Sequence, residues 1–115
     1  MIKRGDIWWA DLPDPVSSGP GYRRPVLVVQ DDEFNSSLIR TVVVAIISTN
    51  LNLAAASGNV MLTVRQSGLP KDSVVNVSAL LTIDKSLLAE LVQGLSAAKM
   101  EQISRGLKLV LSLNK

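Results

Sequence analysis

Two adjacent arginines, Arg23 and Arg24, stand where a loop becomes an apolar strand in the stretch PGYRRPVLVV, residues 20–29. A guanidinium group stays charged, and its planar fork can bind two oxygens of one phosphate. Glycines and hydroxyl side chains just before the arginines allow backbone N–H groups to approach the same anion. The pattern is compatible with phosphate binding. Solvated charges that protect the start of a strand are the alternative interpretation.

A second polar group, Ser48-Thr49-Asn50, follows directly on the apolar run 41–47. A hydroxyl at the end of a buried strand is a suitable donor to a phosphate oxygen. All three residue types also favour turns, so a plain turn at the end of the strand is the alternative.

Trp8 and Trp9 alternate across a predicted strand, so at most one of them faces the core there. The other is available to cover a helix, to lie at an interface or to stack on a nucleobase.

The composition narrows the chemistry that these residues can perform. The 115 residues include no His and no Cys, which removes zinc sites, thiol nucleophiles and disulfides. Ten Asp and Glu residues are spread along the chain, so we expect no metal and no cofactor. The net charge of +2 permits an anionic partner. No apolar run is long enough for a membrane helix and no secretion signal opens the chain, so we expect a cytoplasmic protein.

The strands and the helix that must position the candidate residues are predicted to form one domain, residues 1–115. Its fold class is mainly β, of the α+β type. Hydrophobic patterning predicts strands over 5–12, 25–30, 41–47, 59–64, 73–77 and 87–91. The run 25–30 is continuously apolar, as in a strand buried on both faces. From Ser96, a plausible N-cap, the period becomes helical, and we expect the stripe Met100, Ile103, Leu107, Val110 and Leu111 to face the core.

Five blocks resemble, in order, the signature stretches of MazF/PemK-type toxins. They are RGDIWWADL (4–12), RPVLVVQ (24–30), ISTN (47–50), PKDSVVNV (70–77) and TIDK (82–85). The resemblance implies an SH3-like, PemK-type antiparallel barrel with a C-terminal helix, assembled as a homodimer. It also implies a type II toxin of the mRNA interferase kind. Such a toxin is a metal-independent endoribonuclease that cuts single-stranded RNA and is neutralised by a MazE-like antitoxin.

The same resemblance assigns catalytic positions to Arg24, Ser18 and Ser48, with Thr49 as the alternative hydroxyl beside Ser48. Ser48 replaces the usual threonine of the family. Gly19 and Pro20 stand where some members carry an acidic residue and a glutamine, so we expect no carboxylate base in this loop. The residues expected to bind RNA are Arg23, Thr49, Asn50, Gly19, Gly21, Tyr22, Asn35 and Asn76.

The chemistry expected of such an enzyme uses the 2′-OH of RNA as the nucleophile and leaves a 2′,3′-cyclic phosphate and a 5′-OH. Positioning and charge stabilisation then supply most of the rate, because arginine is a poor acid or base at neutral pH. Two alternatives remain: a CcdB-like gyrase poison and a non-catalytic SH3-like RNA-binding module. The Arg24 loop distinguishes a nuclease from a gyrase poison, because a gyrase poison has no use for it. Only an assay distinguishes a nuclease from a passive RNA-binding module.

Overall fold

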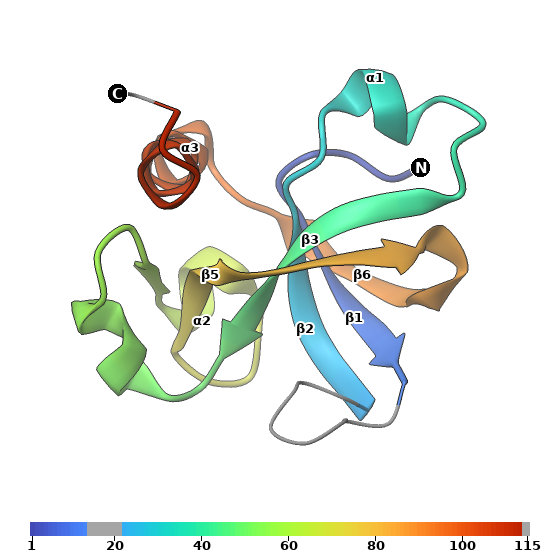
Figure 1. Ribbon diagram of the computed structural model, residues 1–115. Helices are drawn as coiled ribbons and strands as arrows, with labels where there is room; N and C mark the ends of the chain where they lie inside the picture. Colours follow the sequence, from blue (N-terminus) through green and yellow to red (C-terminus); the bar gives the residue numbers. More distant parts are fainter. Residues whose placement is uncertain (14–21, 114–115) are drawn as a thin grey trace.

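The computed structural model describes residues 1–13 and 22–113, which form a six-stranded sheet and a C-terminal helix (Figure 1). The strands are β1 (Asp6–Leu12), β2 (Tyr22–Val28), β3 (Thr41–Ser48), β4 (Val60–Leu62), β5 (Ser73–Asp84) and β6 (Leu88–Gly94). The helices are α1 (Asp32–Asn35), η1 (Leu51–Ala55), α2 (Val64–Ser67), η2 (Lys85–Leu87) and α3 (Ala97–Val110). The strand order is β4-β5-β3-β2-β1-β6, and every neighbouring pair is antiparallel. The sheet curls into a half-barrel, which confirms the predicted fold class.

The two central strands, β2 and β3, are buried on both faces. Leu27 and Ile47 belong to a core that α3 covers, whereas Val26 and Val44 belong to a second core inside the curl of the sheet. This arrangement confirms the interpretation of the continuous apolar run as a doubly buried strand. It also means that both tryptophans of β1 pack on a core, Trp9 on the first and Trp8 on the second.

Strand β5 crosses from one core to the other. Its pairing with β3 passes from Ile46–Asn76 to Ala45–Leu80, so residues 77–79 form a bulge. Before the bulge Val75 packs in the first core, and after it Ile83 packs in the second. A bulge bends a strand and increases its twist, which is how one strand can serve both layers. The predicted strand 73–77 therefore covered only the first part of β5.

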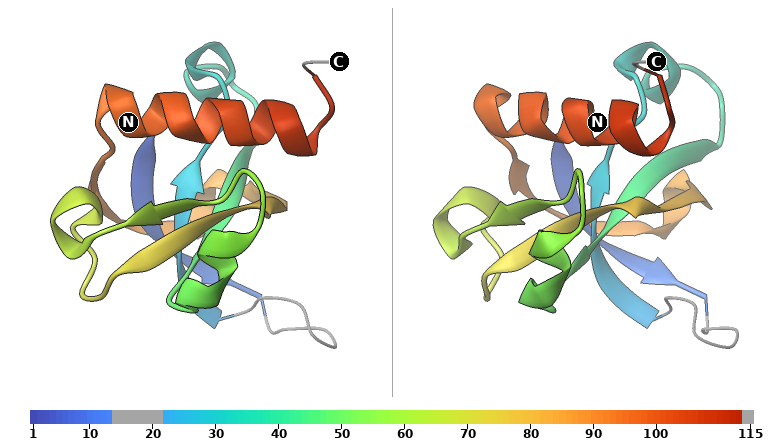
Figure 2. Two further views of the ribbon diagram at one scale, coloured as in Figure 1. Left: turned by 90° about the vertical axis from the view of Figure 1, so that its left-hand side faces the viewer. Right: turned by 60° about the vertical axis from the view of Figure 1, so that its left-hand side comes forward.

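Helix α3 lies across the strands, as Figure 2 shows side-on. The Ser96 side chain accepts a hydrogen bond from the Lys99 backbone N–H at 3.2 Å, which confirms Ser96 as the N-cap. Ile103 is fully buried, and Met100 and Leu107 pack against the first core.

The predicted apolar stripe is wrong in the last turn of α3. Val110 and Leu111 are 42% and 51% exposed there, because the first core ends before them.

Candidate functional site

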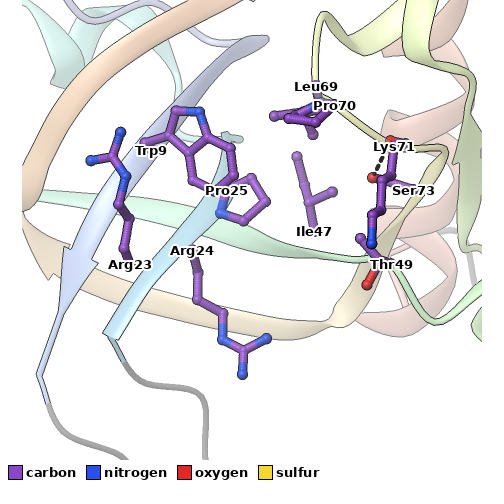
Figure 3. A pocket seen from close by; sticks show the side chains of 10 residues that line it. All are labelled: Trp9, Arg23, Arg24, Pro25, Ile47, Thr49, Leu69, Pro70, Lys71 and Ser73. Carbon is purple, nitrogen blue, oxygen red and sulfur yellow. Dashed lines mark hydrogen bonds between the residues drawn. The ribbon is translucent and has the colours of Figure 1, made fainter.

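A pocket of about 320 Å³ lies where β2 and β3 diverge (Figure 3). The paired part of these strands ends at Val26 and Ile46. Beyond that pair, the start of β2 and the end of β3 form two walls, and the turn before β5 forms a third. The lining residues are Trp9, Arg23, Arg24, Pro25, Ile47, Thr49, Leu69, Pro70, Lys71 and Ser73.

The lining residues combine an apolar surface with positive charge. Three cations, Arg23, Arg24 and Lys71, stand around aromatic, aliphatic and proline side chains. Within 1–13 and 22–113, no Asp or Glu lines the pocket. A cavity of this composition attracts an anion that also carries an apolar or aromatic part.

Arg24 is exposed and lies at the rim of the pocket, as Figure 3 shows. Pro25 follows it, and a residue before proline is held in an extended conformation. Because β2 continues into the doubly buried stretch from Val26, the backbone that carries Arg24 is anchored to the core. The structure therefore places the predicted phosphate-binding arginine on a rigid element beside a cavity.

Arg23 lines the same pocket, and two carboxylates and an aromatic ring contact its guanidinium group. Its Nη2 lies 2.8 Å from Glu90 Oε1 on β6, and its Nη1 lies 3.8 Å from Asp11 Oδ1 on β1. Its guanidinium carbon lies 5.2 Å from the centre of the Trp9 ring. These exposed ion pairs contribute little stability, but together with the cation–π contact they fix how Arg23 lies.

Thr49 lines the pocket, whereas Ser48 and Asn50 organise the turn after β3. Ser48 Oγ accepts a hydrogen bond from the Asn50 backbone N–H at 3.0 Å. Asn50 Oδ1 accepts one from the Asn52 backbone N–H at 3.2 Å and caps η1. Ser48 and Asn50 therefore stabilise the turn after β3 through their side chains. Thr49, between them, lines the pocket.

Lys71 is the lining cation that the sequence did not single out. It lies on the turn between α2 and β5, which is held on both sides. Ser73 Oγ donates to the Lys71 carbonyl at 2.9 Å, and Asp72 Oδ1 accepts from the Val64 backbone N–H at 3.0 Å. The stretch Pro70-Lys71-Asp72 opens one of the family-like blocks (70–77), but its composition is that of any surface turn, so the sequence indicated no role for Lys71 in the site.

Tyr22 begins β2 close to the pocket without lining it. Its side chain is 64% exposed, and its φ of 61° lies in the left-handed region, which is uncommon for a non-glycine residue.

The structure does not bring Asn35 to this site. Asn35 is buried in α1, at the other end of the molecule from the start of β2 (Figure 1). Its Nδ2 donates to the Gln30 carbonyl at 2.9 Å and to Asp32 Oδ1 at 3.0 Å, and its Oδ1 accepts from Gln30 Nε2. A side chain with its polar atoms so engaged is not available to read a base.

Asn76 also has a local structural partner. Its Oδ1 accepts hydrogen bonds from the Ser78 backbone N–H at 3.2 Å and from Ser78 Oγ at 2.8 Å, at the bulge of β5. Asn76 does not line the pocket.

Ser18, Gly19 and Gly21 lie outside the described residues. In the part of the chain that is described, no three metal-binding side chains of the His, Cys, Asp or Glu type form a group. No helix of that part is long and apolar enough to cross a membrane.

Fold and site together define a small α+β half-barrel with a cationic pocket suited to a phosphate-bearing ligand. The chain belongs to the family of PemK-like, MazF-like toxins of type II toxin–antitoxin systems, whose pattern matches residues 3–111.

Known proteins similar to this chain agree with that family. It is 47% identical over 113 residues to the endoribonuclease MazF6 of Mycobacterium tuberculosis, covering 98% of this chain and 99% of the relative. It is 37% identical over 114 residues to the endoribonuclease MazF of Staphylococcus epidermidis, covering 99% and 94%. A mycobacterial endoribonuclease solved in complex with its cognate antitoxin has the same fold, with a TM-score of 0.79 at 21% identity, covering 98% of this chain and 97% of that one.

Proposed function

We propose that this protein is an endoribonuclease toxin that cuts single-stranded RNA at short sequences without a metal ion. Relatives at 47% and 37% identity over nearly the whole chain are endoribonucleases by name. The observation that carries the proposal is the pocket between β2 and β3, where Arg24 and Thr49 lie beside an apolar surface.

The proposed reaction is an internal transesterification of the RNA. The 2′-oxygen attacks the adjacent phosphorus, and the bond from phosphorus to the 5′-oxygen breaks. The 2′-OH loses its proton and the departing 5′-oxygen gains one, which leaves a 2′,3′-cyclic phosphate and a 5′-OH. Since RNA supplies the nucleophile, the protein has to align the groups and stabilise the charge that develops on the phosphate oxygens.

Arg24 is the residue to which we assign that charge stabilisation. Its planar fork matches two oxygens of one phosphate. Thr49 supplies a hydroxyl donor to the same phosphate, because it lines the pocket; Ser48, which does not line it, is the alternative donor. Ser18 and the backbone of Gly19 and Gly21 are assigned to the other side of the phosphate by the family resemblance.

The proposed partners follow from the family. We propose a homodimer in the cytoplasm that a MazE-like antitoxin neutralises by covering the RNA site. The solved mycobacterial neighbour is an endoribonuclease bound to its cognate antitoxin. Four apolar side chains at and just after the end of α3 (Leu109, Val110, Leu111 and Leu113) are 42–68% exposed, and exposed apolar side chains are available for an interface.

The test is incubation of the purified protein with a long single-stranded RNA in EDTA, followed by mapping of the new ends. We expect cuts at a repeated short sequence with 5′-OH ends. Arg24→Ala should lower the rate by about 10²–10³-fold. The matched control is Arg105→Ala, which removes an exposed arginine of α3 and should leave the rate unchanged.

Intact RNA from a folded protein would contradict the proposal. Inhibition of DNA gyrase in a supercoiling assay would then identify a gyrase poison. RNA binding without new ends would identify a passive RNA-binding module.

A further inference from the structure

The pocket wall on the side away from Arg24 is apolar. Trp9 and Pro25 form one side of it, and Leu69 and Pro70 form the other, as Figure 3 shows. Nucleobases unstacked from single-stranded RNA are bound by such surfaces, because every base has a π-face that stacks on an aromatic ring. A phosphate clamp alone has no use for an apolar wall of this extent.

The ring of Trp9 is held in place by its surroundings. It packs against the first core, and the Arg23 guanidinium lies over it, 5.2 Å from the ring centre. Arg23 is in turn tied to Glu90 at 2.8 Å. Figure 3 places Arg23 on one side of Trp9 and the rest of the pocket on the other. A ring fixed in this way loses little entropy when a base stacks on it.

Lys71 adds a positive charge at the rim of this apolar wall. The turn that carries it is fixed by the hydrogen bonds of Ser73 and Asp72, so the position of its backbone is defined. An ammonium group on a flexible stem binds a phosphate as a point charge and does not require the bidentate geometry of arginine.

We infer that this pocket binds one unstacked nucleobase of the RNA beside the cut phosphate, stacked on Trp9, and that Lys71 contacts the neighbouring phosphate. The inference rests on the proposed RNA cleavage. It assigns Arg24 to the phosphate that is cut, and Trp9 and Lys71 to binding of the adjoining nucleotide. Stacking tolerates any base, so this site contributes affinity and register without selecting one base by hydrogen bonds.

The first test changes the substrate and leaves the protein intact. Short oligoribonucleotides that contain the mapped cut site are made with one abasic position at a time. At one position beside the cut, loss of the base should lower kcat/KM by about 5- to 100-fold, the value of one base–aromatic stack. In Trp9→Leu, the same abasic substitution should cost less than about 2-fold, because the stack is already absent.

Lys71 is tested by the salt dependence of binding to an oligoribonucleotide with a 2′-O-methyl group at the cut site, which blocks the nucleophile. Lys71→Ala should weaken binding and reduce the slope of log K against log salt by about 0.7. Lys71→Arg should restore the parent slope. Lys108→Ala removes an exposed lysine of α3 as the matched control and should keep that slope.

Two results would overturn the inference while RNA cleavage stands: no abasic position that depends on Trp9, or a Lys71→Ala slope equal to that of Lys108→Ala. Thermal melting of each variant identifies a loss of fold. If Trp9→Leu fails to fold, the abasic series on the parent protein together with the Lys71 slope decides. Absence of any cleavage by the parent would instead contradict the proposed function.

Discussion

Gly106 of α3 lies in direct backbone contact with Gly58, in the turn before β4. A Cβ at position 106 would overlap the Gly58 carbonyl oxygen. Gly58 has a φ of +87°, a conformation that side chains other than glycine rarely adopt, so its backbone has little room to move. The close approach of the helix to the sheet therefore depends on both glycines.

Gly106→Ala should lower the free energy of unfolding by about 3 kcal/mol, because the added methyl group overpacks a contact between two backbones. Urea denaturation followed by circular dichroism measures this change. Gly94→Ala is the matched control: its Cβ would meet its nearest atom, Asp6 Oδ1, at 3.6 Å, an ordinary contact. Its effect should stay within about 0.5 kcal/mol, and equal losses in the two variants would contradict the role of the Gly58–Gly106 contact.

Arg24→Lys keeps the charge at the rim of the pocket but removes the planar fork. If two phosphate oxygens are bound at once, kcat should fall by about 10-fold, less than in Arg24→Ala. Single-turnover cleavage of a short RNA measures the rate. Arg23→Lys is the companion variant, and its loss should be smaller because we assign the phosphate that is cut to Arg24 and not to Arg23. A larger loss of kcat in Arg23→Lys than in Arg24→Lys would contradict this assignment and show that Arg23 binds the phosphate that is cut.

Thr49→Val replaces the hydroxyl by a methyl group of nearly the same size. We expect kcat to fall by about 10²-fold, as for loss of one donor to a developing charge. Ser48→Ala should instead mainly lower stability, by about 1 kcal/mol, since it removes the acceptor for the Asn50 backbone N–H. Cleavage rates and urea midpoints of both variants check this. If the Ser48→Ala protein were stable but inactive, Ser48 and not Thr49 would be the hydroxyl that donates to the phosphate.

The pH dependence of stability should depend on Asp32. The Arg4 backbone N–H donates to its carboxylate at 2.7 Å and the Asn35 side chain at 3.0 Å, and these bonds hold the pKa of Asp32 below its ordinary value. Its contribution to stability is therefore complete above the unfolded pKa of about 3.9 and is lost as the pH falls through the lower folded value. Urea midpoints at pH 6, 4 and 3 should fall less steeply below pH 4 in Asp32→Asn than in the parent.

Part of that pH dependence should persist in Asp32→Asn. The Ser86 backbone N–H donates to Asp84 at 2.8 Å and lowers the pKa of that carboxyl as well. Identical pH profiles for the parent and Asp32→Asn would contradict the prediction for Asp32.

The sequence predicted those parts of the fold whose signal is local. The apolar runs at β2 and β3, and the helical period after Ser96, each lie within one element, so hydrophobic patterning located them. The second half of β5 was missed because its alternation is interrupted by the bulge at residues 77–79, which is defined only by pairing with β3.

The candidate site was predicted in part for a similar reason. Arg24 and Thr49 stand beside strong strand signals, and both line the pocket. Lys71 joins them only through the antiparallel arrangement of β3 and β5, which the sequence does not display. The structure separates Asn35 from the pocket, and a polar residue in a polar connection gives no sign that it folds inward onto Gln30 and Asp32.

The passage of β5 through both cores has a consequence for how the protein unfolds. Val75 and Ile83 both belong to β5, and β5 pairs with all eight residues of β3. Neither core can therefore open while the other keeps its packing, and the two layers should behave as one cooperative unit. Amide hydrogens of β3 and the β5 residues paired with it should exchange with solvent only through global unfolding, at one common free energy.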